Sequence, residues 1–204
     1  MLDVDILKLI AITDALHGSA EKLVSRAVEA VEGGATCIQL RLKDVTPREL
    51  AGIARAMLKQ IRVPLIINDR ADVAIAVGAA GCHLGADDIP VSAVRKLAPP
   101  GFVIGCSVGS DAEVSASADA DYAGIGPVFT TSTKHDAGRA IGLEGFSSLA
   151  SKVGIPAVGI GGITAENARS VIEAGAAGVA VVSSIFSARD VKSAATSIAH
   201  AIER

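Results

Sequence analysis

Several residue types and patterns are scarce in this sequence, and each shortage excludes a class of protein. Only 2% of the 204 residues are aromatic, so alanine, valine, isoleucine and glycine must carry the packing, which favours thin layers of strand and helix. No run of about 18 or more uncharged apolar residues occurs, so we expect no membrane span. The net charge is -3 and the pI is near 5.8, so no basic surface for nucleic acid is indicated.

Cysteine is scarce, and the first residues lack basic side chains. The three cysteines, Cys37, Cys82 and Cys106, cannot all pair with one another, and their spacing fits no metal motif. Each lies at the start of an apolar run or within one, which is typical of a buried, reduced thiol. Residues 1–5 include two aspartates and no basic residue, unlike a signal peptide. We therefore predict a soluble cytoplasmic protein with no nucleic-acid or membrane partner.

One pattern repeats along the chain: an amphipathic helical stretch ends at glycine, and a short apolar run follows. Glu32–Ala35 precedes Cys37–Leu40, and Ala174–Gly178 precedes Val179–Val182. Glycine just past a helix is the usual C-terminal cap. Half of the residues are hydrophobic, which is enough for a sizeable core. Short apolar strands that alternate with helices of roughly 10–15 residues indicate βαβ units and a parallel sheet.

Eight such units are predicted. The strands are expected at Lys8–Ile12, Thr36–Leu40, Leu65–Ile67, Gly81–Leu84, Val103–Cys106, Tyr122–Ile125, Ala157–Ile160 and Gly178–Val182. The helices are expected at Ala20–Glu32, Pro47–Gln60, Asp72–Val77, Ser92–Ala98, Asp111–Ser117, Gly142–Lys152, Ala165–Ala174 and Val191–Ile202. We predict a single (β/α)8 TIM barrel over residues 1–204, compact beside the roughly 250 residues typical of that fold. A doubly wound open sheet is the alternative, but residues 13–18 are no Gly-rich dinucleotide turn.

Polar residues follow the predicted strands, where the active sites of such barrels lie. In strand order from the second strand, they are Gln39, Arg41 and Lys43; Asn68, Asp69 and Arg70; Asp87 and Asp88; Ser107; Thr131, Thr133 and Lys134; Gly161 and Gly162; and Ser183 and Ser184. Loops are polar in any protein, so part of this distribution is expected without function. A charge inside an apolar run, such as Arg41, is harder to explain in that way.

Asp69 and Asp88 follow neighbouring predicted strands. Adjacent strands lie about 4.8 Å apart, so both carboxylates can reach one ion. Two carboxylates, substrate phosphate oxygens and water are a usual environment for Mg2+. The alternative is structural, with Asp69 capping the helix that starts near Arg70, and Asp87 or Asp88 capping the next.

Gln39, Arg41 and Lys43 share one face of a strand end, because side chains alternate with period two. Two cations and an amide suit an anionic or heteroaromatic ligand. The alternative is a salt bridge to Asp44, Asp69 or Asp88, which is compatible with ligand binding.

Two further stretches offer donors for phosphate. Ile125–Lys134 contains three threonines, a serine and a lysine where a strand gives way to a loop. Gly161-Gly162 and Ser183 follow the last two predicted strands, whose loops often bind phosphate in this fold. The alternatives are a solvated loop for the first stretch and a tight turn for the glycines.

The histidines are less informative. His83 lies within a predicted strand, and we expect it to be packed in the barrel rather than catalytic. His135 either assists the site or is solvated. No Ser-His-Asp or Cys-His arrangement is indicated.

Taken together, these segments resemble the thiamine-phosphate synthase family. The matching segments are Gln39–Lys43, Ile67–Arg70, His83–Gly85 with Asp88, Gly105–Ser107, Gly124–Pro127 leading to Phe129 and Thr131–Lys134, Ile160–Ile163 with Asn167, and Gly178–Ser183. Each piece is modest, but the ordered set is highly specific.

The resemblance implies a transferase that condenses 4-amino-2-methyl-5-pyrimidinylmethyl diphosphate with a thiazole phosphate, in its carboxylated tautomer. Thiamine phosphate and pyrophosphate would result, by dissociative loss of pyrophosphate. By the family pattern, the pyrimidine diphosphate is held by Gln39, Arg41, Lys43, Asn68, Ser107 and Lys134, of which Arg41, Lys43 and Lys134 neutralise the leaving group. Asp69 and Asp88 would hold the cofactor Mg2+. The thiazole phosphate would be held by Thr131, Thr133, Gly162, Val182 and Ser183.

The sequence departs from the family pattern at two places. Ala86-Asp87 stands where the family usually has Gln-Glu, and Phe129-Thr130 replaces an aromatic-proline pair. Three rival functions remain: a thiazole tautomerase of the same superfamily, a non-catalytic thiazole-phosphate or thiamine-phosphate binding protein, and a phosphosugar barrel such as an epimerase. The resemblance also allows a homo-oligomer.

Overall fold

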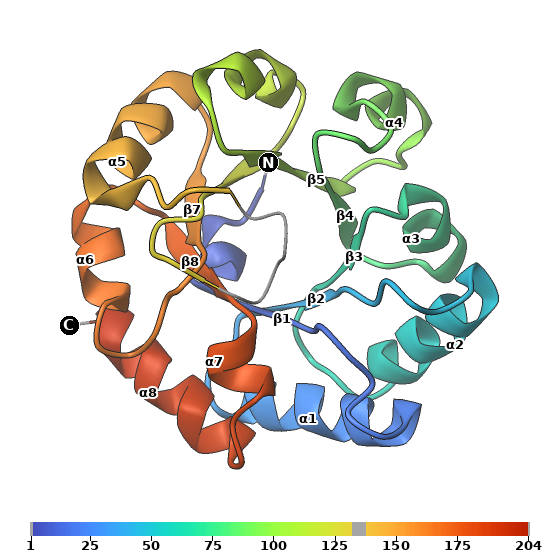
Figure 1. Cartoon of the computed structure of the whole chain (residues 1–204). Helices are drawn as coiled ribbons and strands as arrows, with labels where there is room; N and C mark the ends of the chain where they lie inside the picture. The colour runs from blue at the N-terminus through green and yellow to red at the C-terminus, as the bar shows by residue number, and fades with distance from the viewer. Residues whose placement is uncertain (1, 132–137, 204) are drawn as a thin grey trace.

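The chain folds as a closed barrel of parallel strands inside a ring of helices (Figure 1). The computed structural model describes residues 2–131 and 138–203. The strands are β1 (Leu9–Ile12), β2 (Cys37–Leu40), β3 (Leu65–Asn68), β4 (Gly81–Leu84), β5 (Val103–Val108), β6 (Tyr122–Ile125), β7 (Ala157–Ile160) and β8 (Gly178–Val181). Each strand pairs in parallel with the next, and β8 pairs with β1. The predicted (β/α)8 barrel is therefore confirmed, and the open sheet is excluded.

The helices follow the strands in chain order. They are α1 (Ala20–Glu32), α2 (Pro47–Leu58), α3 (Ala71–Val77), α4 (Val91–Leu97), α5 (Gly142–Val153), α6 (Ala168–Glu173), α7 (Ser183–Phe186) and α8 (Val191–Glu203), with 3-10 helices η1 (Val4–Leu7) and η2 (Asp111–Ser117). Local signals explain several of the starts. Thr46 and Glu49 form a capping box at α2, with Pro47 in its first turn, and Ser19 caps α1 through the Lys22 amide.

The predicted boundaries differ from the structure in three informative places. Residues 111–117 form a 3-10 helix rather than the expected α-helix. Helix α6 begins at Ala168 rather than Ala165, because the Asn167 side chain accepts from the Thr164 amide and holds the preceding residues in a turn. Val182 was expected to end the last strand, but its backbone (φ -111°, ψ -85°) starts the unpredicted helix α7.

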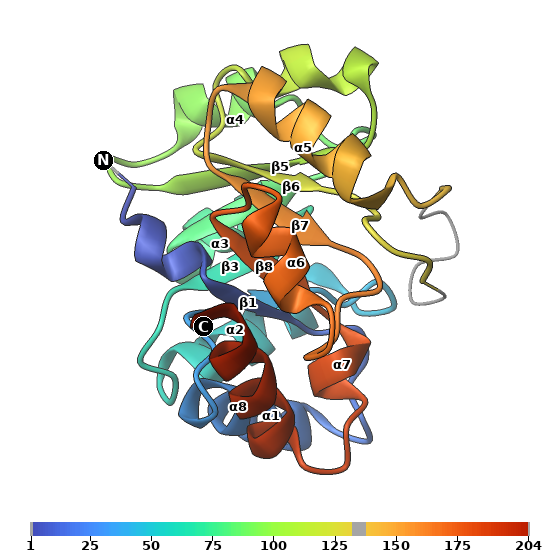
Figure 2. The same ribbon diagram turned by 90° about the vertical axis from the view of Figure 1, so that its left-hand side faces the viewer.

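Two apolar shells hold the barrel together. The larger lies between the strands and the helices, and the smaller fills the barrel interior with Leu7, Ile10, Ile66, Tyr122 and Val158 among its residues. Leu7 belongs to η1, which lies at the N-terminal end of the strands (Figure 2). Apolar residues of the interior cluster, with Leu7 from η1 among them, therefore fill the N-terminal end of the barrel.

The three cysteines are free and buried, as the sequence predicts. Burial raises the pKa of the Cys37 and Cys82 thiols to about 12 and that of Cys106 to about 11. Because the thiolate is the reactive species, we expect none of the three to react with a disulfide reagent at pH 8 until the protein unfolds. Thiol titration with and without urea checks this expectation, and rapid labelling of native protein would contradict it.

No helix in the described part of the chain is long and apolar enough to cross a membrane.

Candidate active site

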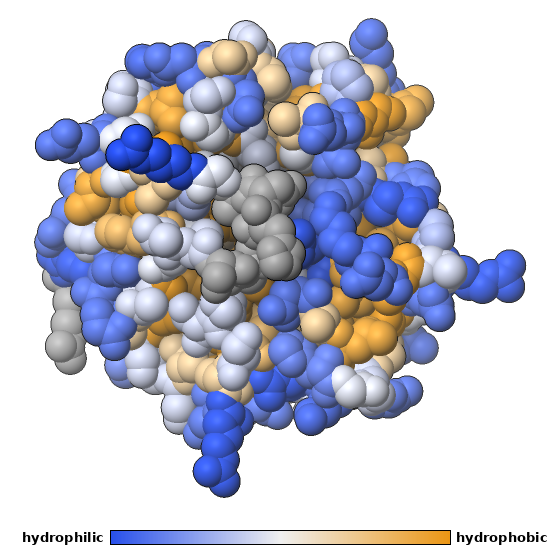
Figure 3. All heavy atoms as spheres, viewed as in Figure 1, coloured by the Kyte–Doolittle hydropathy of each residue, from blue (hydrophilic) through white to orange (hydrophobic). Residues whose placement is uncertain are grey.

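A cavity of about 740 Å3 opens at the C-terminal ends of the strands. Hydrophilic residues gather beside its mouth, over the ends of β2 to β4 (Figure 3). Every predicted site residue within the described ranges lines this cavity: Gln39, Arg41, Lys43, Asn68, Asp69, Asp88, Ser107, Thr131, Gly162, Val182 and Ser183. Thr133, Lys134 and His135 lie outside the described residues. The barrel therefore brings to one place residues that the sequence spreads over about 145 positions.

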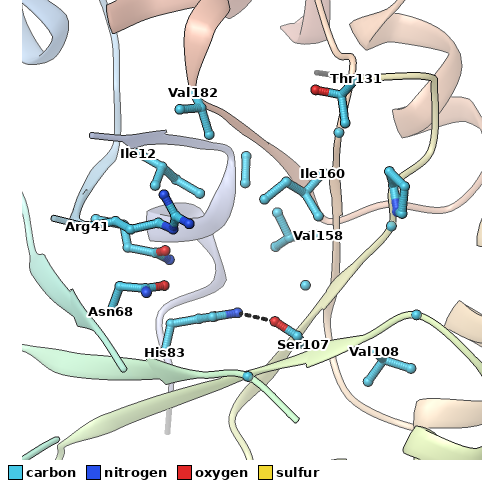
Figure 4. Close-up of a pocket in the computed structure, with 18 of the residues that line it drawn as sticks. Ile12, Arg41, Asn68, His83, Ser107, Val108, Thr131, Val158, Ile160 and Val182 are labelled. Atoms are coloured by element: carbon cyan, nitrogen blue, oxygen red, sulfur yellow. Dashed lines mark hydrogen bonds between the residues drawn. The ribbon is translucent and has the colours of Figure 1, made fainter. Parts of the chain in front are cut away.

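Polar residues gather on one side of the cavity and apolar residues on the other (Figure 4). Arg41, Asn68 and His83 lie on the first side, with Ile12 beside Arg41, and Val158 and Ile160 lie on the second. The division follows from the alternation of side chains along each strand, because inward positions are polar near the ends of β2 to β5 and apolar on β7. Such a cavity suits a ligand with an apolar ring and an anionic group.

Arg41 is placed by the threonine that follows the neighbouring strand β1. Thr13 is fully buried, and its hydroxyl donates to the Arg41 carbonyl (3.0 Å) while accepting from the Arg41 amide (2.9 Å). The Thr13 amide also donates to the Gln39 carbonyl (3.0 Å). These bonds continue the pairing of β1 with β2 beyond the strand ends, so the backbone that carries Gln39 and Arg41 is fixed at the cavity.

Asp69 has an unusual backbone for a residue with a side chain. Its φ is +62°, and its amide donates to the His83 carbonyl of the next strand (2.8 Å). Asp is among the few residue types that tolerate this left-handed conformation, which clusters at functional sites. The Asp69 carboxylate forms an ion pair with Lys43 inside the cavity. The salt-bridge alternative for Lys43 is thus confirmed, and it places the pair among the cavity residues.

The second carboxylate, Asp88, accepts from the Gly85 amide (2.7 Å). Burial raises the pKa of Asp88, and a hydrogen bond with the Asp69 carboxyl raises it further. The two acids therefore face each other across the ends of β3 and β4. The capping alternative is wrong for both, because the N-cap residues of α3 and α4 are Arg70 and Pro90, and neither helix start has a side-chain cap.

Two facing carboxylates repel each other when both are ionised, and they form a suitable pair of ligands for a divalent cation. Their mutual repulsion is relieved either by a proton, as the raised pKa of Asp88 indicates, or by a cation. Among residues 2–131 and 138–203, no group of three or more acids, histidines or cysteines surrounds a common point. A cation here would need oxygens from a ligand or water, which is the environment that Mg2+ prefers.

We expect Asp88→Asn to stabilise the protein in EDTA at pH 8. A carboxyl whose pKa is raised by folding costs stability as the pH rises through its unfolded value, and the amide removes this cost. Because Asp88 is partly exposed, solvent screening limits the gain to less than about 1 kcal/mol. Urea unfolding measures it, and a lower free energy of unfolding for the variant at pH 8 would contradict the expectation.

The loops after β6 and β7 are bonded to each other at the other side of the mouth. The Val128 amide donates to the Ile160 carbonyl (2.8 Å), and the Phe129 amide donates to the Gly161 carbonyl (3.0 Å). Gly162 has a φ of +65°, and a Cβ there would lie 2.6 Å from the Thr130 carbonyl oxygen. The tight turn expected as an alternative is therefore present, and it lets the backbone of the two loops meet beside the cavity.

Several cavity residues were not predicted as site residues. His83 is packed in the barrel as expected, but it also borders the cavity, as do Tyr122, Glu113 and Arg139. His83 and Tyr122 occupy inward positions of β4 and β6, so strand alternation is the signal that indicates them. Glu113 and Arg139 lie outside the strands, and no sequence pattern indicates them.

Comparison with known proteins gives one consistent result. The family model described as thiamine monophosphate synthase matches residues 9–185. A thiamine-phosphate synthase from Azorhizobium caulinodans is 48% identical over 202 residues, covering 97% of this chain and 95% of the relative. One from Methanoculleus marisnigri is 46% identical, covering 93% and 92%.

Solved structures agree with the sequence relatives. A thiamine phosphate pyrophosphorylase from Pyrococcus furiosus has a TM-score of 0.87 and 39% identity, and 98% of this chain and 97% of that chain are covered. A 3-hexulose-6-phosphate synthase has a TM-score of 0.77 at 19% identity, which shows a shared fold alone.

Proposed function

This chain belongs to the thiamine monophosphate synthase family, and on that premise we propose how its cavity makes thiamine phosphate. The protein is an enzyme, a transferase. Its substrates are 4-amino-2-methyl-5-pyrimidinylmethyl diphosphate and a thiazole phosphate. The bond between the pyrimidine's methylene carbon and the diphosphate oxygen breaks, the thiazole nitrogen bonds to that carbon, and pyrophosphate leaves. The observation that carries the proposal is one cavity lined by two cations, Arg41 and Lys43, by two facing carboxylates, Asp69 and Asp88, and by apolar residues such as Val158 and Ile160.

The polar side takes the diphosphate. Arg41 and Lys43 neutralise the charge that grows on the leaving oxygen, and the Ser107 hydroxyl donates to the same group. Lys134, which lies outside the described residues, adds a third cation. The bonds from Thr13 hold the Arg41 backbone before the ligand arrives, so little reorganisation is needed during the reaction.

Asp69 and Asp88 would hold Mg2+, whose charge, when bound, stabilises the departing pyrophosphate. These residues suit Mg2+, because the two facing carboxylates supply two oxygen ligands and the diphosphate supplies further oxygens. Lys43 is shared between Asp69 and the diphosphate, because its ammonium lies at the carboxylate that borders the ligand.

The two rings lie between the polar and the apolar side. Gln39 and Asn68 hold the aminopyrimidine with their amides, and the electron-rich ring stabilises the positive charge left on the methylene carbon. Val158 and Ile160 exclude water, which would otherwise capture that carbon. The thiazole phosphate binds between the loops after β6, β7 and β8, through Thr131, Thr133, Gly162, Val182 and Ser183. No protein nucleophile is required.

The test is product formation from the two phosphorylated precursors with Mg2+. Thiamine phosphate and pyrophosphate are expected in equal amounts, measured by fluorescence after oxidation to the thiochrome and by a pyrophosphate assay. Folded protein that yields neither product would reject the proposal. Interconversion of thiazole phosphate tautomers by the same sample would then favour the tautomerase, and calorimetric binding without turnover would favour a binding protein.

A further inference from the structure

Three polar side chains form a line from the barrel core to the cavity. The Tyr122 hydroxyl lies 3.0 Å from His83 Nδ1. On the other side of the ring, His83 Nε2 lies 3.1 Å from Ser107 Oγ, the bond drawn in Figure 4. Tyr122 and Ser107 both border the cavity, but Tyr122 is 1% exposed and packs in the interior apolar cluster, whereas Ser107 is among the residues proposed to hold the diphosphate. The line therefore joins a residue buried in the apolar core to a residue that meets the ligand.

The neighbouring strands leave room for this line by placing glycine beside it. A Cβ on Gly105, which is paired with Tyr122, would lie 2.2 Å from the tyrosine ring. A Cβ on Gly124, which is paired with Ser107, would lie 3.0 Å from His83 Cε1. Since both rings occupy space that ordinary residues would fill, Tyr122 and His83 have little freedom to turn.

The direction of the hydrogen bonds follows from the partners at the buried end. Tyr122 is buried, and burial raises the pKa of its phenol well above its usual range, so the hydroxyl keeps its proton. His83 Nδ1 lies 3.0 Å away and can accept this proton, so the Tyr122 hydroxyl donates to His83 Nδ1 and is not left as an unsatisfied buried donor. A neutral imidazole that accepts at Nδ1 carries its proton on Nε2, so His83 donates to Ser107 Oγ.

We propose that Tyr122 and His83 are positioning residues that make the Ser107 hydroxyl a hydrogen-bond donor toward the bound diphosphate. With its oxygen accepting from His83, Ser107 keeps its own proton for the ligand, whose oxygens only accept. If the bond ran in the opposite direction, Ser107 would donate its proton to His83 and could not donate it to the ligand. This inference rests on the proposed function, because it assigns the use of Ser107 in that reaction.

The first test measures the histidine tautomer in the apo protein, without any reaction. Long-range 15N–1H correlation spectra, assigned with His83→Gln, are expected to show His83 protonated on Nε2. Tyr122→Phe removes the donor to Nδ1 and is expected to give a mixture of tautomers, whereas Ser107→Ala should keep the Nε2 proton. Wild type protonated on Nδ1 would overturn the proposal.

The second test is a double-mutant cycle on kcat. Ser107→Ala is expected to lose about 100-fold, the usual effect of one donor to a developing charge, and Tyr122→Phe about 10-fold. In the Ser107→Ala background, Tyr122→Phe should lower kcat less than about twofold, because the hydroxyl that Tyr122 and His83 would orient is already absent. Ser117→Ala is the matched control, since it deletes a buried hydroxyl that donates within η2 (Oγ to the Val114 carbonyl, 2.7 Å), and it should keep kcat.

A pair of amide variants separates the two ends of His83. Glutamine retains a polar group near the Nε2 position facing Ser107, and asparagine retains one near the Nδ1 position facing Tyr122. We expect His83→Gln to keep kcat within about threefold and His83→Asn to lose about 10-fold or more. If the wild type is active, equal losses of kcat in the two His83 variants, or additive losses in the double-mutant cycle, would overturn the positioning role and leave the proposed function standing. Inactive wild type would instead reject the proposed function.

Discussion

Removing the charge of Asp69 is expected to reduce kcat by on the order of 10³-fold, and EDTA is expected to have the same effect on the wild type. The reason is that Asp69 and Asp88 face each other at the mouth, where the leaving group needs a cation. Product formation at saturating substrates, with added Mg2+ or with EDTA, measures both effects. Mg2+ should restore the wild type but not the Asp69→Asn variant.

The choice of substitution separates charge from backbone. Asn tolerates the left-handed conformation at residue 69, whereas Ala there costs about 1–2 kcal/mol. Asp69→Asn should therefore unfold near the wild-type temperature, and Asp69→Ala should unfold lower. Asp72→Asn is the matched control, because Asp72 pairs with Arg70 (2.6 Å) outside the cavity and should leave kcat unchanged. Full activity of Asp69→Asn, or of the wild type in EDTA, would discard the metal role of this residue.

Gly178→Ala is expected to destabilise the fold by about 3 kcal/mol or more. A Cβ at this position would lie 1.9 Å from the Leu7 carbonyl oxygen and 2.8 Å from Lys8 Cα, so backbone rather than a flexible side chain must move. The clash falls where β8 meets the start of β1 and so opposes closure of the barrel. Urea unfolding measures the loss.

Gly52→Ala is the control for this substitution. Gly52 lies in α2, and a Cβ there meets nothing within 4 Å. Alanine favours a helix interior by about 0.5–1 kcal/mol over glycine, so this variant should be more stable than the wild type. A Gly178→Ala protein as stable as the wild type would show that the closing strands can separate at little cost.

Much of the fold and the membership of the cavity could be predicted from the sequence because the signals are local. Strand alternation alone places Gln39, Arg41 and Lys43 on one face, and all three line the cavity. The order of the strands likewise brings Asp69 near Asp88, as predicted. In both cases the information lies within a few residues of a strand end.

The rest depends on contacts between segments that are distant in the chain. The left-handed backbone of Asp69 reflects its bond to the His83 carbonyl, which no local pattern encodes. The line from Tyr122 to Ser107 depends on the relative register of β4, β5 and β6. Helix α7 was missed because its four residues are too few for a periodic signal.

The pairing of β1 with β8 also sets a condition on how the protein is made. When β1 leaves the ribosome, its second partner lies roughly 170 residues further along the chain, which at 5–20 residues per second takes roughly 9–34 s to synthesise. Throughout that interval the growing sheet has two unpaired parallel edges, the kind of surface that recruits other chains. Translation that stops before Gly178 therefore leaves a chain that lacks β8 and cannot close the barrel.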